Sequence, residues 1–487
     1  MPLILPGNVG SATAATGFNV SNSLRFNRGS SDSLNKTLGT PTNVDIATFS
    51  TWIKFSDVTS SNDTAIFAAT ADGNNTTHLE KLGSQVFRLN MREGSTYIGV
   101  LTTNRKFRDP SAWFHIVVAF DTTQGTEANR VKLYINGVQE TSFSTATYPT
   151  QNVDLRFNTS GQVFNIGNRG DTGNHPDAYY AETVFIDGQQ LAADQFGEFD
   201  SDSGIWKPID VSGLTFGNNG FYLQYKETGT SANASGIGAD TSGETNHFTV
   251  NNLTAVDQST DTCINNFATM NPLDNYYAGG TFAEGNLQVT TGNSMYSYNT
   301  ATIGVASGKW YWEVKWSAQN TGSTNQVVIG IAKRTVVSAT VWLGSVAWTF
   351  AYEGSSGHVK VSDGNATNST STTYSVGDII SVALDLDNNK IHFAKNGTYT
   401  NSSDAAGNSG GVTITAPDST SGDSGFYFPA FGDGNANLIQ TGQFNFGAGP
   451  PYAISSGNTD GNGFGNFEYA VPSGFFALCT KNLAENG

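Results

Sequence analysis

Charged residues are scarce in this sequence of 487 residues. They make up 13% of the chain, about half of the ~25% that is usual in soluble domains. Aromatic residues, in contrast, reach 12%, and 55 residues are glycine. A disordered chain has many charges and few aromatic residues. The composition therefore predicts a folded core under a neutral polar surface of Ser, Thr, Asn and Gly.

Basic residues are the rarest charged class. The 24 lysines and arginines are outnumbered by 41 acidic residues, which gives a net charge of −17 at pH 7. A field of that sign repels phosphate backbones and anionic lipid surfaces. The sequence thus argues against nucleic acid as a partner, and solubility is the simplest role for the negative charge.

Cysteine pairs, export signals and membrane spans are also missing. Cys263 and Cys479 form no C-x-x-C motif, so a zinc or redox site is not expected, and each is predicted to be a free thiol. Residues 1–10 lack the basic start and apolar core of a signal peptide. No apolar run reaches the roughly 18 residues of a membrane helix, so no membrane insertion is expected. A neutral polar surface without an export signal is what a virion component released by lysis would look like.

Alternation of apolar and polar residues recurs along the chain, whereas helical periodicity of useful length is absent. FSTWIKF at 49–55 alternates, and KWYWEVKW at 309–316 alternates strictly, as half-buried strands do. The run from Val131 turns at Asn136-Gly137, because both turn residues of a tight hairpin need positive φ. The chain is therefore expected to be all-β, with two antiparallel β-sandwich (jelly-roll) domains in tandem and an ordered connector.

Strand spacing also predicts where the domains begin and end, because periodicity weakens between roughly 200 and 275. The expected divisions are an N-terminal arm at 1–17, a first β-sandwich at 18–200, a connector at 201–275, a second β-sandwich at 276–450 and a C-terminal segment at 451–487.

Two aromatic segments of the second half carry specific expectations. In KWYWEVKW, Trp310, Trp312, Val314 and Trp316 share one face, which we expect to be the core side of a half-buried strand. Near the C-terminus, SGFFALC at 473–479 has two interpretations. It either adds a strand to the second sandwich or meets a partner protein.

Two sets of motifs resemble known families. FSTWIKF, WFHIVVAFD from Trp113, VKLYINGV from Val131 and YYAETVFIDGQQL from Tyr179 resemble the laminin-G-like branch of the concanavalin A-like sandwiches, over about 18–200. SGKWYWEVKW, VVIGIAKR, GDIISVALDLDNNKIHFAKNG and FYFPAFGDG resemble a SPRY domain, over about 280–450. This second resemblance implies a protein-binding sandwich without catalytic activity.

The segments that join these motifs show a third resemblance. FGEFDSDSGIWKP, GNNGFYLQY, NNFATMNPL and SGFFALCTKNL resemble bacteriophage tail-associated virion proteins that combine these two folds. The resemblance implies a tail fibre or related appendage. It also implies a homo-oligomer in contact with other virion proteins, and a trimer is the first expectation.

Catalytic clusters are not evident. Glycan hydrolases with a concanavalin A-like fold carry acids spaced as E-x-D-x-x-E on one strand. Glu182 comes nearest to this pattern, but its same-face neighbour is Val184. His115 and His392 lie in expected strands and are predicted to be structural. A Ser-His-Asp triad stays open, because its members need not be adjacent in sequence. The protein is expected not to be an enzyme.

Candidate binding residues lie at the ends of expected strands in the second sandwich. Trp342 and Trp348, flanked by Ser, Thr and Gly, are candidates for stacking on a sugar ring. Tyr352 in the segment 352–358, with Asp433 and Asn435 in the segment 432–437, is predicted to line the same surface.

Cofactors are not expected, with one possible exception. Asp171 and Asp177 offer the oxygen donors that Ca²⁺ prefers. The laminin-G-like resemblance implies a calcium site at such a loop rim, so these two carboxylates are the metal candidates.

Together these features predict a phage virion structural protein, such as a tail fibre, with lectin-like modules for host attachment. Its ligand would be a cell-surface glycan or protein, bound tightly because many weak sites act together. Two alternatives stay open. One is a capsid decoration or fibre-connector protein that binds mainly other virion subunits, and the other is a glycan depolymerase.

Overall fold

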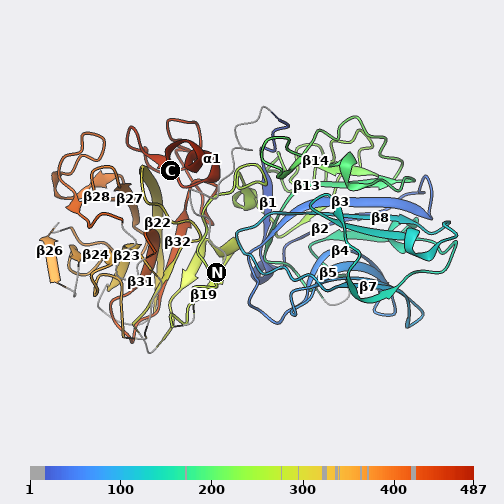
Figure 1. The fold of residues 1–487 in the computed structure, drawn as a ribbon, viewed down its shortest axis with the longest axis horizontal. Helices are drawn as coiled ribbons and strands as arrows, with labels where there is room; N and C mark the ends of the chain where they lie inside the picture. Colours follow the sequence, from blue (N-terminus) through green and yellow to red (C-terminus); the bar gives the residue numbers. More distant parts are fainter. Residues whose placement is uncertain are drawn as a thin grey trace. The chain divides into compact units, whose positions relative to one another are not determined.

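The computed structural model describes residues 17–170, 173–275, 277–293, 296–320, 326–334, 338, 340–361, 365–369, 372–417 and 424–487. The chain divides into a first unit that ends at Ile264 and a second unit that begins at Asn265. Almost all regular structure is β, and antiparallel pairing predominates (Figure 1). The expected all-β fold is confirmed. In the part of the chain that the structure describes, no helix is long and apolar enough to span a membrane.

Two stacked sheets build the first unit, and we name each after a central strand. In spatial order, the β3 sheet contains β10 (Val138–Gln139), β9 (Val131–Ile135), β8 (Phe114–Asp121), β3 (Ile46–Phe55), β13 (Ala178–Asp187), β1 (Ser23–Phe26) and β18 (Gln258–Ser259), and β16 (Phe221–Leu223) also pairs with β13. The β5 sheet contains β11 (Phe143–Thr147), β7 (Thr96–Thr103), β6 (Phe87–Glu93), β5 (Asn75–Lys81), β4 (Thr64–Asp72), β12 (Val163–Ile166), β2 (Ser33–Thr37) and β17 (Thr249–Asn251).

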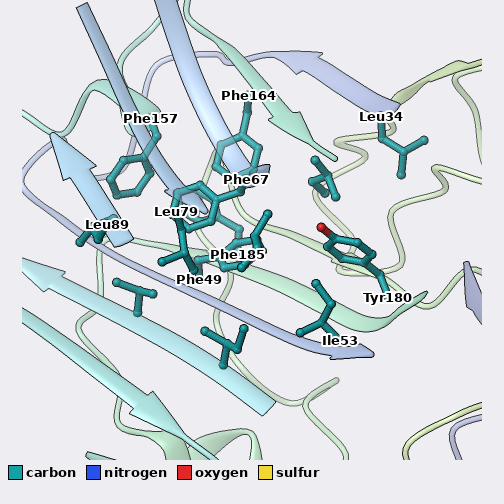
Figure 2. Close-up of a cluster of buried hydrophobic side chains, with 14 of the residues drawn as sticks. Leu34, Phe49, Ile53, Phe67, Leu79, Leu89, Phe157, Phe164, Tyr180 and Phe185 are labelled. Carbon is teal, nitrogen blue, oxygen red and sulfur yellow. The ribbon is translucent and has the colours of Figure 1, made fainter. Parts of the chain in front are cut away.

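Aromatic rings fill the space between these two sheets (Figure 2). Phe49 of β3 and Phe185 of β13 face Phe67 of β4 and Phe164 of β12. The rings of Phe67 and Phe164 stack with centroids 5.7 Å apart. The alternation of β3 places Phe49, but not its polar neighbours, in this core, as strand periodicity requires.

The hairpin between β9 and β10 has the predicted turn. Asn136 has φ 47° and Gly137 has φ 80°, the left-handed conformations that a two-residue hairpin turn needs. A Cβ at Gly137 would lie 2.4 Å from the Trp206 ring. This position therefore requires glycine both for its backbone and for its surroundings.

The segment expected to be a connector is largely part of the first unit. Its short strands β16, β17 and β18 pair with β13, β2 and β1 respectively. A separate hairpin, β14 (Gly197–Phe199) and β15 (Trp206–Pro208), spans the expected boundary at residue 200. The sequence predicts a strand at 221–225, which contains β16. Strands of two or three residues are too short to show alternation, which is why the sequence alone did not place β17 and β18.

Two sheets also build the second unit. In spatial order, the β22 sheet contains β19 (Thr281–Ala283), β20 (Gln288–Thr290), β32 (Gln440–Asn445), β22 (Lys309–Gln319), β27 (Ile379–Asp385), β28 (Lys390–Lys395) and β29 (Thr398–Tyr399), with β30 (Val412–Thr413) beside β28 and β33 (Phe476–Ala477) beside β22. The β23 sheet contains β21 (Tyr298–Thr300), β31 (Phe428–Asp433), β23 (Val327–Ala332), β24 (Thr349–Glu353), β25 (His358–Val361) and β26 (Asn365–Ser369).

Strand β22 has the predicted core face but a different outer face. Trp310, Trp312 and Trp316 are buried between the two sheets. On the other face, Tyr311 and Glu313 are buried as well, so the strand is not half-buried as expected. Glu313 accepts hydrogen bonds from the backbone N–H groups of residues 468 and 469 at 3.0 and 2.8 Å. The C-terminal segment therefore covers this face.

The C-terminal segment folds back onto its own unit. Phe476 and Ala477 form β33, which runs parallel to β22, so the strand-addition interpretation of SGFFALC is confirmed. The chain then ends in α1 (Thr480–Asn486). Short 3-10 turns occur at Arg28–Ser30, Glu127–Asn129, Arg156–Asn158, Ala193–Gln195, Ala255–Asp257, Glu284–Asn286 and Thr400–Ser402. The expected arm at 1–17 lies outside the described residues except for Gly17.

Candidate functional site

The outer face of the β23 sheet has small side chains, and a tryptophan-bearing segment packs on it. Leu343 is buried there, and Trp342 is half-buried against the same cluster. Small residues leave room for this segment to lie close to the strands. The buried residues of the face are Ala278, Tyr298, Val328, Ala332, Leu343, Ala351 and Ala430.

Trp348 lies on the same face, and an arginine side chain stacks on its ring. The guanidinium carbon of Arg334 is 3.5 Å from the centre of the Trp348 ring. Trp348 Nε1 donates to Tyr298 Oη at 3.4 Å, and Tyr298 Oη donates to the Arg334 carbonyl at 3.1 Å. We call Tyr298, Arg334, Trp342 and Trp348 the tryptophan face. Two of the predicted ligand residues are thus held on one surface.

Tyr352 and Asp433 do not belong to this surface. Tyr352 lies in the core, with its ring 4.9 Å from that of Tyr374, and its hydroxyl donates to the Thr372 carbonyl. Asp433 is fully buried, and burial raises its pKa to about 8. Both follow the alternation of their strands, which turns these positions inward. The structure therefore assigns them to the interior rather than to a ligand-binding loop.

Asn435 shapes a loop. It follows β31 and is half-buried, and its side-chain oxygen accepts from the Asn437 N–H at 3.0 Å. The preceding residue, Gly434, donates to the Gln326 carbonyl at 2.6 Å. The Asn435 side-chain oxygen therefore stabilises a turn at the end of the β23 sheet, separate from the tryptophan face.

Of the two calcium candidates, only Asp177 lies in the described part of the chain. Asp171 lies outside the described residues. Asp177 accepts from the Arg28 backbone N–H at 2.9 Å, and its other carboxylate oxygen lies 3.9 Å from Arg28 Nε. The Arg28 guanidinium therefore already supplies a positive charge beside Asp177. No group of three or more His, Cys, Asp or Glu residues suited to a metal occurs among residues with a described position.

A Ser–His pair in the first unit resembles a catalytic dyad only in its composition. Ser50 Oγ lies 2.8 Å from His115 Nε2, and Trp206 Nε1 donates to His115 Nδ1 at 3.0 Å. Because an indole N–H only donates, Nδ1 accepts and the ring proton resides on Nε2. A general base needs the opposite tautomer. Burial also lowers the pKa of His115 to about 3, so this histidine is neutral and structural.

Glu182 occupies an unusual position in β13. It has φ 49° at a register shift between Ala181 and Val184, and its carboxylate accepts a hydrogen bond from the Tyr222 hydroxyl. Burial raises its pKa to about 7. Backbone strain of this kind marks a specialised position.

The cavity beside Glu182 is too small for a sugar ring. It measures about 10 Å³, and Ser50, Trp52 and His115 also line it. Glycoside hydrolysis needs a second carboxylate about 5–10 Å away, and no other carboxylate lines this cavity among the described residues. The cavity has room for about one water molecule.

Sequence reasoning missed the partners that define these positions. Trp206 and Tyr222 come from the segment expected to be a connector, and Arg334 follows β23 without any periodic signal. The density of aromatic residues between 205 and 225 was the available indication that this segment packs on a sheet.

Comparison with known proteins agrees with the two sandwiches. Residues 309–448 match the SPRY domain family, and residues 25–192 match the concanavalin A-like lectin/glucanases superfamily. A search of curated proteins found no match.

Solved structures resemble parts of the chain at low identity. The SPRY domain of human HERC1 is 20% identical, with a TM-score of 0.26, over 32% of this chain and 86% of that chain. A heptameric SAP-like pentraxin from Limulus polyphemus is 14% identical, with a TM-score of 0.28, over 37% and 82% of the two chains. A putative carbohydrate-binding protein from Bacteroides ovatus is 12% identical, with a TM-score of 0.32, over 48% and 59%.

Domains of these two families suggest a binding role. The chain thus joins a concanavalin A-like domain to a SPRY domain.

Proposed function

We propose that the protein is a non-catalytic attachment protein that binds a cell-surface glycan through the tryptophan face. The observation that carries this proposal is the position of two half-buried tryptophans. Trp342 packs on the outer side of the β23 sheet, and Trp348 is hydrogen-bonded to Tyr298 of the same face. Aromatic rings held rigidly at a surface stack on the apolar faces of sugars. Tyr298, which is buried and bonded to Trp348, supplies that rigidity.

The catalytic alternatives have less support. His115 is neutral and has the tautomer that donates to Ser50, and Glu182 has no second acid beside it in its cavity. A depolymerase would need one of these groups to act as acid or base. The proposal therefore assigns binding, rather than cleavage, to the chain.

We place the protein on the outside of a phage virion, as a tail fibre or related appendage. The support is the resemblance of its joining segments to tail-associated virion proteins and its neutral polar composition. In a symmetric assembly, with a trimer as the first expectation, weak sites on several copies bind one surface together. In the alternative, a decoration or connector protein, the same domains bind other virion subunits instead of a glycan.

A glycan array probed with the full chain tests the proposal. Binding to one or more surface polysaccharides is expected, and a connector protein predicts no hits. Incubation with the bound polysaccharide, followed by an assay for new reducing ends, tests the depolymerase alternative. Immunogold labelling of particles would place the protein on the tail, on the capsid or on neither.

A further inference from the structure

Arg334 is the single arginine of residues 265–487, and its position on the tryptophan face is fixed from two sides. The Lys333 N–H donates to the Trp348 carbonyl at 2.9 Å, which continues the pairing of β23 with β24. Tyr298 Oη donates to the Arg334 carbonyl at 3.1 Å. The guanidinium then stacks on the Trp348 ring. A planar cation held in this way has already lost much of its side-chain freedom before any ligand binds.

No acidic partner neutralises Arg334 among the described residues. Three lysines of this unit do have one: Lys309 pairs with Asp385 at 2.9 Å, Lys360 with Glu353 at 3.4 Å and Lys395 with Asp378 at 3.1 Å. The Nε atom of Arg334 is buried and has no hydrogen-bond acceptor in the described part of the chain. The side chain as a whole is half-buried rather than covered, so its charge can act on an anion at the surface.

The number of cations near Arg334 indicates how much negative charge the anion carries. The neighbouring base, Lys333, turns away, because its Nζ donates to the Ala416 carbonyl at 2.9 Å and lies 5.4 Å from the Tyr427 ring centre. A single guanidinium matches a carboxylate, which has one charge and two oxygens in one plane. A phosphate monoester carries nearly two charges, and Lys360, a second cation close to Trp342, is already paired with Glu353 at 3.4 Å.

We propose that Arg334 is the group of the tryptophan face that binds the ligand's anion, and that the ligand is a saccharide bearing a carboxylate, such as a uronic acid. This inference rests on the proposed function, because it assumes that the tryptophan face binds sugars. Arg334 pairs with the carboxylate through two parallel N–H donors. The half-buried ring of Trp342, on the same face, supports the apolar side of a sugar.

Titration of the full chain with a glucuronic acid oligosaccharide and with its carboxyl-reduced counterpart tests the proposal. We expect the acidic form to bind about tenfold more tightly or better, since charge-assisted hydrogen bonds contribute roughly 1.5–3 kcal/mol. R334K keeps the charge but loses the two-donor geometry, so R334K and R334Q should remove most of this preference. Both variants should weaken binding of the acidic oligosaccharide much more than binding of the reduced one.

The matched control is R92K in the first unit. Arg92 also packs on an aromatic ring, 5.3 Å from the centre of Tyr97, so this variant makes the same chemical change at another stack and should alter neither affinity. Thermal melts identify any variant that fails to fold. If R334K does not fold, the wild-type chain still tests the proposal. It should bind the acidic oligosaccharide more tightly than the reduced one, and this difference in affinity should shrink at high salt.

The outcomes separate this inference from the proposed function. Equal affinity for both oligosaccharides overturns the carboxylate preference and leaves glycan binding intact. Failure of every array glycan to bind contradicts the proposed function itself. Arg334-dependent binding of an oligoglutamate peptide, without saccharide binding, overturns the saccharide class.

Discussion

Lys54 and Asp261 form a buried ion pair that fastens the end of the first unit to its β3 sheet. Each side chain is 1% exposed. Asp261 also accepts from Trp113 Nε1 at 3.1 Å, and Lys54 Nζ lies 4.9 Å from the centre of the Tyr179 ring. Burial lowers the pKa of Lys54, and Asp261 opposes that shift. The pair thus joins β3 to a segment more than 200 positions later in the chain.

Removing one partner of this pair should be costly. Asp261→Asn leaves the Lys54 charge buried without a counter-ion, and we expect the first unit to lose about 3–5 kcal/mol of unfolding free energy. The double variant K54M/D261L removes both charges and should lose less than the single variant. Urea unfolding of the full chain measures both. A double variant less stable than Asp261→Asn would contradict this account.

Glu182 should make the stability of the first unit depend on pH. Its pKa in the folded chain is about 7, whereas an unfolded Glu has a pKa of about 4.3. As pH rises from about 4 to 7, the unfolded chain releases this proton while the folded chain keeps it. This contribution is therefore fully present below about pH 4, is lost as pH rises through 7, and stays lost above 7.

Glu182→Gln tests that dependence, because the substitution keeps the shape and removes the ionisation. Thermal melts between pH 5 and 8 should show a smaller decline in the variant than in the wild type. Glu244 is exposed and its side chain has no ion pair among the described residues, so Glu244→Gln is the matched control. Identical pH profiles for Glu182→Gln and the wild type would show that the carboxyl is not buried as described.

Substitutions at Gly137 and Gly161 distinguish the cost of backbone strain from the cost of a steric clash. Both have φ near 80°, but a Cβ at Gly137 would meet the Trp206 ring, whereas a Cβ at Gly161 has open space. Gly161→Val should cost roughly 1–2 kcal/mol, through its left-handed backbone alone. Gly137→Val should cost more, because Trp206 must also move. Chemical unfolding of the two variants checks this order, and equal losses would argue against the Trp206 contact.

Trp312 tests the register of β22. Its ring is 1% exposed between the two sheets of the second unit, so Trp312→Ala should cost about 3–5 kcal/mol. Trp342→Ala, at a half-buried outer position, should cost clearly less. A loss below about 1 kcal/mol for Trp312→Ala in urea unfolding would contradict the assigned register.

The sequence was informative where strands are long. Strand β22 has 11 residues, so its alternation predicted which tryptophans are buried. It did not reveal that Tyr311 and Glu313 are covered, because the covering segment is Gly- and Asn-rich and has little regular structure. Similarly, β16 and β18 have three and two residues. Their places depend on pairing with strands far away in the chain, which periodicity does not report.

The candidate site was predicted only in part, for related reasons. Trp342 and Trp348 lie on the outer face, but Tyr352 and Asp433 point inward. The inward position of Tyr352 follows from the alternation of AWTFAYE, in which it shares a face with Phe350. Arg334 had no pattern to mark it, since its importance depends on a contact with Trp348 and on the absence of a described acidic partner.

Ligand contact at the tryptophan face is the central claim, and tryptophan resonances test it most directly. The full chain labelled with 5-fluorotryptophan gives signals that single Trp→Phe variants assign. On addition of a bound glycan from the array, the account predicts shifts at Trp348 and Trp342 and none at buried Trp310, Trp312 and Trp316. Saturable binding that leaves Trp342 and Trp348 unshifted would contradict it.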